Sequence, residues 1–325
     1  MSKEECQTSL VGKIPSRPDF VRINIVEPEA VEFATWLEQA AEACRRTHCD
    51  GKHPTVNFLF VPEQGKAALV GVVRPSNDTV GRSSPVAIFA PLTGARTSPT
   101  YPGVIRAASG FLIAAAKLLE SSKTETQATV EARLKELSVP TGADLAATQQ
   151  STKALLLDTR CGGHHDALFD RSVPEQHLYA YRTLAMACEQ ARSYRPGGKP
   201  GVTLDCPTLD DAQLVIWAEM IRRLLGNQRV APSLFWVYGV PPPGYGSVTL
   251  KARATPARLL ACLGAATPLA PAFMANADSD NPKLWPLKTT STAAVEKAKA
   301  ALSSEQRAVL ARPDASLEAV IDAFT

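Results

Sequence analysis

The stretch that decides the fold runs from residue 56 to residue 92 and reads VNFLFVPEQGKAALVGVVRPSNDTVGRSSPVAIFAPL. Residues 56–61 and 67–73 are two apolar, β-rich runs separated by a short segment with proline and glycine, which predicts a hairpin. Residues 85–92 form a third β-rich run. Because short connections join neighbouring runs, we expect the strands to pair in antiparallel fashion.

The prolines divide the rest of the chain into segments that favour helices and segments that do not. The chain has 325 residues and 25 prolines, and long stretches without proline separate them. Since proline breaks helix interiors, helices are expected in these stretches. Apolar residues at helical spacing predict helices at residues 29–46, 103–120, 126–138, 174–193, 209–225 and 255–263.

The second half of the chain repeats this alternation of strands and helices without repeating any sequence. Further strands are predicted at residues 202–205, 234–238 and 247–250, and the tail predicts two or three short amphipathic helices. The fold class is therefore expected to be α+β. An antiparallel or mixed β-sheet would be flanked by helices in an α/β/α-like sandwich, with a smaller helical C-terminal tail.

The length of the chain allows one large domain or two ordinary ones. We divide the sequence into an N-terminal domain at residues 1–140, a connecting segment at 141–172, a second α/β region at 173–275 and the helical tail at 276–325. The connecting segment is rich in Thr, Ala, Gln and Asp, so it is predicted to be the least ordered part.

Composition excludes several classes of protein. Apolar residues make up 45% of the chain and the net charge is +3, which argues against disorder and against a basic nucleic-acid-binding stripe. The longest apolar stretch, residues 110–119, is half the length of a membrane span, so no membrane insertion is expected. The polar N-terminus is unlike a signal peptide, and the irregular spacing of the seven cysteines predicts reduced thiols. Both observations predict a cytoplasmic protein.

Cysteine and histidine residues gather in two places. The first group is Cys44, His48, Cys49 and His53, whose spacing matches no paired zinc-ligand pattern. We interpret this group as the frayed end of a helix. A glycine-rich turn at residues 195–201 also lacks the spacing of a phosphate-binding loop, and we interpret it as a flexible turn.

The second group is the run Cys161-Gly-Gly-His-His-Asp166. Here Cys161, His164 and His165 could form a metal loop or a nucleophile with its base. No other cluster completes a metal shell, so an exposed polar loop is the favoured interpretation.

Two further segments, residues 10–22 and 74–85, place charged residues among glycine and proline between apolar runs. Rigid turns of this kind either hold local backbone geometry or form the rim of a docking surface.

These two segments resemble the TagF/ImpM family of type VI secretion accessory proteins. Residues 12–20, GKIPSRPDF, are similar to the family's Gly-Lys-x-Pro-x-x-Gly-Asp-Phe motif, and Trp36 lies in the next predicted helix. Residues 75–85, PSNDTVGRSSP, are similar to its Pro-Ser-x-Asp-x-x-Gly-Arg-x-x-Pro motif. The resemblance covers about residues 9–120. Pro18 replaces a family glycine, and proline cannot adopt the positive φ that glycine permits, so this turn should differ locally.

The resemblance implies a regulator and not an enzyme. Members of the family repress type VI secretion after translation and bind the forkhead-associated-domain scaffold protein of the same system. The resemblance implies no cofactor and no small-molecule substrate. The candidate residues for partner binding or for bracing the two motifs are Lys13, Ser16, Arg17, Asp19, Phe20, Arg22, Asp78, Gly81 and Arg82.

Two roles are distinguished within this set. Arginine is a frequent hot-spot residue, so Arg17, Arg22 and Arg82 are the candidate partner anchors. The alternative is that charged residues brace the two motifs against each other, the candidates being Lys13, Asp19, Asp78 and Arg82.

Two other functions stay open at this point. One is a hydrolase, dependent on a Cys–His pair or on a metal, that uses the loop at residues 161–166. The other is a structural accessory subunit of the secretion apparatus.

Overall fold

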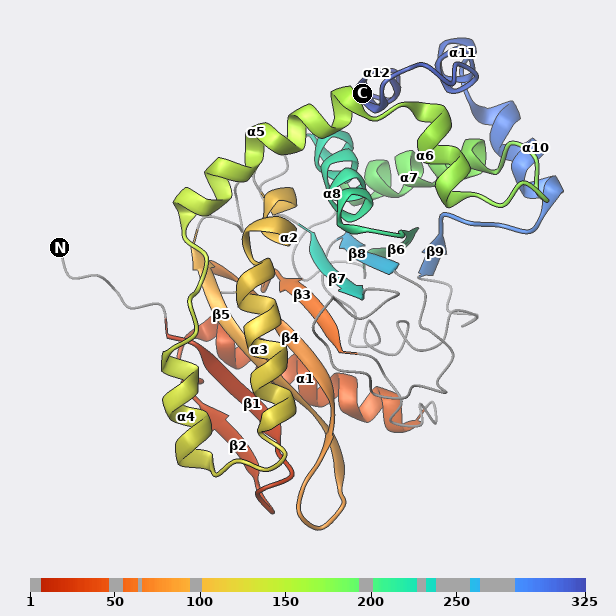
Figure 1. Cartoon of the computed structure of the whole chain (residues 1–325). Coiled ribbons are helices and arrows are strands. Elements are labelled where there is room, and N and C mark those ends of the chain that lie inside the picture. Colours follow the sequence, from red (N-terminus) through yellow and green to blue (C-terminus); the bar gives the residue numbers. More distant parts are fainter. Residues whose placement is uncertain are drawn as a thin grey trace.

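The computed structural model describes residues 7–46, 55–63, 66–93, 101–192, 201–226, 232–237, 258–263 and 284–325. The described strands form one nine-stranded sheet in the order β2-β1-β5-β4-β3-β7-β8-β6-β9 (Figure 1). Their bounds are β1 (Ser9–Lys13), β2 (Phe20–Ile23), β3 (Val56–Phe60), β4 (Ala67–Asn77), β5 (Ser83–Thr93), β6 (Val202–Pro207), β7 (Ser233–Val237), β8 (Arg258–Leu263) and β9 (Leu284–Pro286).

The sheet is mixed and runs through both halves of the chain. Neighbouring strands pair in antiparallel fashion except β6 and β9, which are parallel. The two halves meet where β3 pairs with β7, with Phe58 opposite Phe235 and Leu59 opposite Leu234. The predicted α+β class is confirmed, and of the two sheet types expected the mixed one is found.

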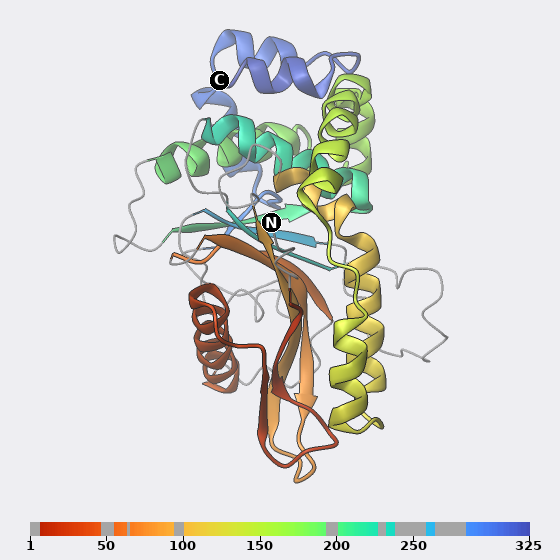
Figure 2. The ribbon, with the colours of Figure 1, turned by 90° about the vertical axis from the view of Figure 1, so that its left-hand side faces the viewer.

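Helices cover both faces of this sheet (Figure 2). Helix α1 (Pro28–Arg46) lies on one face, and α3 (Ser109–Ser121), α4 (Gln127–Lys135), α7 (Gln176–Arg192) and α8 (Asp211–Leu225) lie on the other. The remaining described helices are η1 (Tyr101–Gly103), α2 (Val104–Ala107), α5 (Gly142–Asp158), α6 (Cys161–Leu168), α10 (Thr292–Ala301), α11 (Ser304–Leu310) and α12 (Leu317–Asp322). The tail predicted to hold two or three short helices therefore holds three in its described part.

Aromatic side chains fasten α1 to the sheet. The ring of Phe33 is fully buried, and its centroid lies 4.7 Å from that of Phe58 and 4.8 Å from that of Phe89. One turn further along α1, Trp36 stacks on Phe235 of β7 at 5.3 Å. Helix α1 therefore holds strands from both halves of the chain together on this face.

The prediction that residues 141–172 are the least ordered part is wrong. They contain α5 and α6, and α5 begins with a capping box in which Thr141 and Asp144 satisfy each other's backbone N–H groups. Only Leu145, Thr152 and Leu156 of α5 are buried, so its apolar stripe is too thin to stand out in the sequence. The proposed domain boundaries stay predictions, although one core cluster includes residues of all four segments and one sheet takes strands from three of them.

The helix predicted at residues 255–263 is also corrected. Residues 258–263 form β8, which is buried along its whole length and pairs with both β6 and β7. Short apolar runs do not distinguish a buried strand from a buried helix, and here the two neighbouring strands decide. The strand predicted at 247–250, the turn at 195–200 and the side chains of the cysteine and histidine group at 44–53 lie outside the described residues.

The apolar helix predicted at residues 103–120 is broken near residue 108. Among the described residues, no single helix has the length and apolarity of a membrane span. Residues 101–107 and 109–121 reach those values only when they are combined across a bend of 57°.

Truncating Phe33 tests how much the cover of this face contributes. Replacing Phe33 with Ala leaves a cavity between four aromatic rings, so we expect the free energy of unfolding to fall by about 3–5 kcal/mol. Urea denaturation of purified protein measures this change. The matched control is Val31→Ala on the same helix, because Val31 is 46% exposed, and its effect should stay within about 0.5 kcal/mol.

Candidate functional site

The two motif segments lie side by side at one corner of the sheet. Strands β1 and β5 are neighbours, with Gly12 opposite Val86, so the turn after β1 meets the turn between β4 and β5. Gly12 has a φ of 128°, and a Cβ atom there would lie 2.3 Å from the carbonyl oxygen of Pro85. Only glycine permits this close approach of the two motif segments.

The carboxylate of Asp78 joins the two turns. Its side chain has no exposed surface, and its two oxygens together accept four hydrogen bonds. Oδ2 accepts from Lys13 Nζ at 2.8 Å and from Arg82 Nε at 2.6 Å. Oδ1 accepts from the backbone N–H groups of Val80 at 3.1 Å and Arg82 at 2.8 Å. Of the residues expected to brace the motifs, Lys13, Asp78 and Arg82 are brought together.

Backbone contacts add to this connection. The N–H of Thr79 donates to the carbonyl oxygen of Arg17 at 3.1 Å, and Arg82 Nη2 donates to the carbonyl oxygen of Pro18. Proline keeps its carbonyl acceptor, so Pro18 accepts this bond without needing a positive φ. We name the joined segments, residues 14–19 and 78–82, the paired turns.

The electrostatics favour an ionised Asp78. Burial acts to raise the pKa of this carboxyl, but the hydrogen bonds from Lys13 and Arg82 outweigh it and hold the pKa well below the usual 3.8. Asp78 is therefore a buried anion that both turns need for their geometry.

The other candidate residues lie outside this network. The side chains of Arg17 and Asp19 are exposed and make no hydrogen bond or ion pair within the described residues. Ser16 Oγ is buried and has no hydrogen-bond partner among them. Gly81 adopts a φ of 82°, which the tight turn requires.

Sequence reasoning missed Val80, which is 66% exposed at the apex of its turn. The available signal was an apolar residue within an otherwise polar turn.

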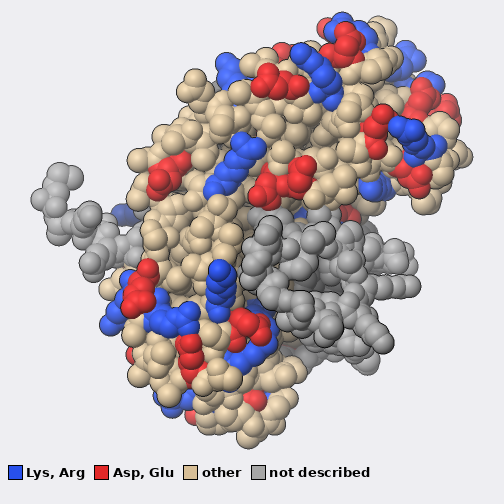
Figure 3. Space-filling view, viewed as in Figure 1, with Lys and Arg blue, Asp and Glu red and all other residues tan. Residues whose placement is uncertain are grey.

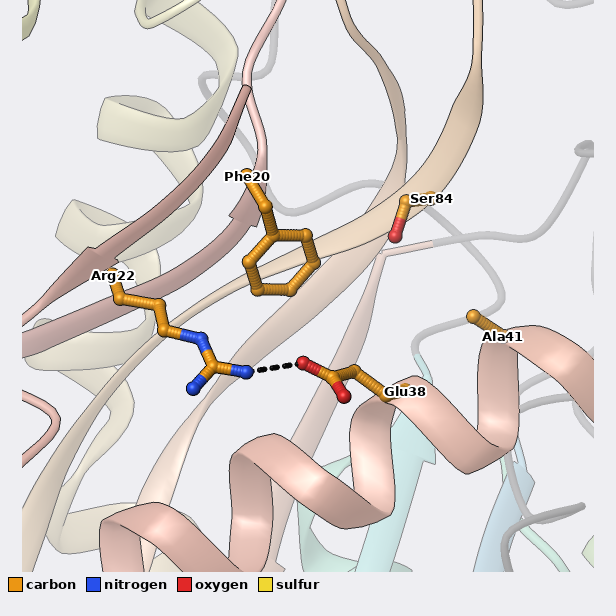
Figure 4. A pocket seen from close by; sticks show the side chains of 5 residues that line it. All are labelled: Phe20, Arg22, Glu38, Ala41 and Ser84. Atoms are coloured by element: carbon orange, nitrogen blue, oxygen red, sulfur yellow. Dashed lines mark hydrogen bonds and ion pairs between the residues drawn. The ribbon is translucent and has the colours of Figure 1, made fainter.

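Phe20 and Arg22 line a shallow pocket of about 470 Å³ between β2 and α1 (Figure 4). Arg22 pairs with Glu38 of α1 at 2.5 Å, and its guanidinium carbon lies 5.6 Å from the centre of the Phe20 ring. Both partners of this ion pair are about half exposed, so it contributes little to stability. On the face shown in Figure 3, basic and acidic side chains are interspersed over the described surface.

The run at residues 161–166, interpreted as an exposed loop, is instead part of helix α6. Cys161 is fully buried and His164 is 3% exposed. Cys161 Sγ lies 3.2 Å from His165 Nε2 one helical turn away, and the ring of His165 stacks on that of His177 at 4.2 Å. A Cys–His pair is one of the alternatives that the sequence leaves open, but the sequence predicts neither the helix nor the burial.

Burial makes this contact unsuited to nucleophilic catalysis. It raises the pKa of the Cys161 thiol to about 12. Burial, together with the neighbouring His177 and His164, lowers the pKa of His165 to about 2. A catalytic cysteine needs a lowered thiol pKa and a base that can take its proton. Within the described residues, no group of three or more His, Cys, Asp or Glu side chains is placed to hold a metal ion.

The fold is α+β, and the paired turns lie in its N-terminal part. Residues 9–138 match the family model of the TagF N-terminal domain, described as type VI secretion system-associated. The match contains both motif segments, strands β1–β5 and helices α1–α4. Residues 9–138 therefore form a TagF N-terminal domain, a domain described as type VI secretion system-associated.

The comparison with solved structures also gives a match. The crystal structure of PA0076 from Pseudomonas aeruginosa PAO1 at 2.05 Å resolution is 15% identical in sequence and gives a TM-score of 0.48. The similarity covers 86% of this chain and 98% of that one. No curated protein matches the sequence.

Replacing Asp78 with Asn tests the connection between the turns. At pH 7 the variant lacks the negative charge that binds Lys13 and Arg82 in the wild type. We therefore expect its Tm to be several degrees below that of the wild type. Because the folded-state pKa lies below 3.8, the wild type loses this advantage as the pH falls from 3.8 towards the folded value. The difference in Tm should therefore stay constant from pH 7 to about pH 5 and narrow below about pH 4, and thermal unfolding between pH 7 and pH 2 measures it.

The control for this experiment is Asp19→Asn, which removes the other carboxylate of the motifs. Its side chain is exposed, so the Tm should match the wild type throughout. Equal effects of the two substitutions would contradict a bracing role for Asp78.

The reactivity of Cys161 tests the second cluster. A buried thiol with a pKa of about 12 should resist alkylation by iodoacetamide at pH 8 in the folded protein and react after unfolding in urea. Mass spectrometry of the labelled peptides follows the reaction. Rapid labelling of Cys161 in the folded state would support a nucleophilic role instead.

Proposed function

We propose that this protein is a post-translational negative regulator of a type VI secretion system and acts by binding the system's forkhead-associated-domain scaffold component. The observation that carries the proposal is the match of residues 9–138 to the TagF N-terminal domain, which contains both motif segments. The regulatory role and the choice of partner come from the resemblance of those motifs to the TagF/ImpM family. A cytoplasmic location belongs to the same proposal.

The paired turns supply a suitable surface for such binding. The side chains of Arg17 and Val80 are exposed, while the backbones of both turns are held by Asp78 and by the bond from Thr79 to Arg17. A surface that is already ordered loses less conformational entropy when a partner binds. Arginine is also among the residues most often found at interface hot spots.

The three candidate arginines are not equivalent in this arrangement. Arg22 is already paired with Glu38, and Arg82 is engaged by Asp78 and the carbonyl of Pro18. Arg17 has no such partner among the described residues, so its guanidinium is available to a carboxylate or a carbonyl of another protein. We assign the anchoring role to Arg17 and the bracing role to Arg82.

We further propose binding and not catalysis as the activity of this chain. The buried, protonated state of Cys161 and the neutral state of His165 favour a packing role for these residues over hydrolysis. The other alternative, a structural subunit of the secretion apparatus, predicts stable co-purification with the assembled machine. A repressor should instead be found with the scaffold component while secretion is off.

Affinity capture from the native cytosol, followed by binding measurements with the purified scaffold component, tests the proposal. Arg17→Ala and Val80→Asp should each weaken binding about tenfold or more without changing Tm, because both side chains are exposed. The matched control is Leu209→Asp, since Leu209 is 65% exposed and lies in the second half of the chain.

Three results would contradict parts of this picture. Failure to recover any secretion component would refute the proposed partner. Equal losses in the Leu209 control would remove the assignment to the paired turns. Loss of Tm in the Arg17 variant would make that residue structural.

A further inference from the structure

A second pocket, of about 430 Å³, lies where η1, α5 and α8 meet. Helix α5 crosses here from the N-terminal part of the chain to the second half (Figure 1). The pocket wall is thus built from segments on both sides of the predicted connecting segment. Its volume falls within the range of ordinary small-molecule sites.

The wall of this pocket is rich in hydrogen-bond donors. Lys153, Gln149 and Gln150 come from α5, and Arg222 and Arg223 come from α8. One carboxylate, that of Glu219, lines the same pocket. The lining therefore has three cations against one anion.

Glu219 orients the two arginines. It is 5% exposed, and its two oxygens accept from Arg222 Nη2 and Nε, each at 2.6 Å. One of these oxygens also accepts from Arg223 Nε at 3.2 Å. A fork of this kind fixes the plane of the Arg222 guanidinium.

The two arginines differ in what they have left to offer. Arg223 also binds Glu318 at 2.9 Å and Asp322 at 3.6 Å, both on α12 and neither lining the pocket. Acidic side chains outside the pocket therefore balance the charge of Arg223. Arg222 Nη1 and Lys153 Nζ have no partner among the described residues, so these two donors are unused in the pocket.

A small oxyanion satisfies these groups best. Two cationic donors and two side-chain amides from two helices can surround one phosphate or carboxylate group, and charged hydrogen bonds to such groups are strong. Glu318 and Asp322 balance the charge of Arg223 from outside the pocket. The lining of the pocket therefore carries more positive than negative charge. We propose that this pocket binds a small molecule bearing a phosphate or carboxylate group and that the ligand bridges α5 to α8.

Thermal unfolding of the full chain with three probes tests the proposal. The probes are inorganic phosphate, ATP and citrate, each compared with sodium chloride at equal ionic strength. A ligand that binds only the folded state raises Tm with its concentration, so at least one probe should do so. Comparing the Tm increase with phosphate and ATP to that with citrate distinguishes a phosphate ligand from a carboxylate ligand.

The variant Lys153→Gln assigns any binding to this pocket. Lys153 is exposed, so its loss should leave the Tm without ligand unchanged while raising the Kd of the active probe about tenfold. Arg222 is unsuitable for this purpose because its removal would strand the buried Glu219. The matched control is Lys135→Gln on α4, which should bind like the wild type. Lys135 is exposed and does not line the pocket.

Two outcomes would overturn the proposal. One is the absence of a Tm increase with all three probes. The other is an equal increase in the wild type and in Lys153→Gln, which would show that the probes bind elsewhere.

Discussion

Pairing between β3 and β7 is the interaction on which the rest of the structure depends. It joins strands about 175 residues apart in the chain into one sheet, with Phe58 opposite Phe235. Both faces of the sheet at this seam are apolar, so both have to be covered. Trp36 of α1 covers the seam on one face by stacking on Phe235, and helices of the larger core cluster, among them α3 and α8, cover the other face.

At the far corner of the same sheet, one buried charge organises the candidate site. A buried carboxylate is tolerated only when its hydrogen-bonding capacity is filled, and Lys13, Arg82 and two backbone N–H groups fill that of Asp78. These bonds reach both motif segments, so they convert two irregular turns into one surface of defined shape. The same bonds leave Arg17 and Val80 exposed, which is why the two residues are assigned to partner binding.

A second buried charge organises helices of the second half and the tail. Glu219 is buried on α8 and is stabilised by Arg222 and Arg223, and Arg223 continues to Glu318 on α12. The network connects α12 of the helical tail to α8. Glu219, Arg222 and Arg223 also line the pocket between α5 and α8. A carboxylate without these arginines would be an unpaired buried charge, so the packing of α8 against α12 depends on the network.

The sequence by itself determined the elements whose signal is local. The hairpin at residues 56–73, the helices at 29–46, 174–193 and 209–225, and the two motif segments follow from apolar spacing, proline positions and turn residues. Bracing by Lys13, Asp19, Asp78 and Arg82 is one of the two alternatives that the sequence leaves open, and the structure joins all of these except Asp19.

The tertiary structure alone decided the features that depend on distant partners. Residues 258–263 are a strand because β6 and β7 flank them, and residues 142–158 are a helix although only three of their side chains are buried. The sequence favours an exposed loop for Cys161 and His165, but they contact each other within a helix, and the surrounding helices bury them and keep the thiol protonated. Spacing along a chain reports which residues share a face, whereas burial and charge state depend on what covers that face.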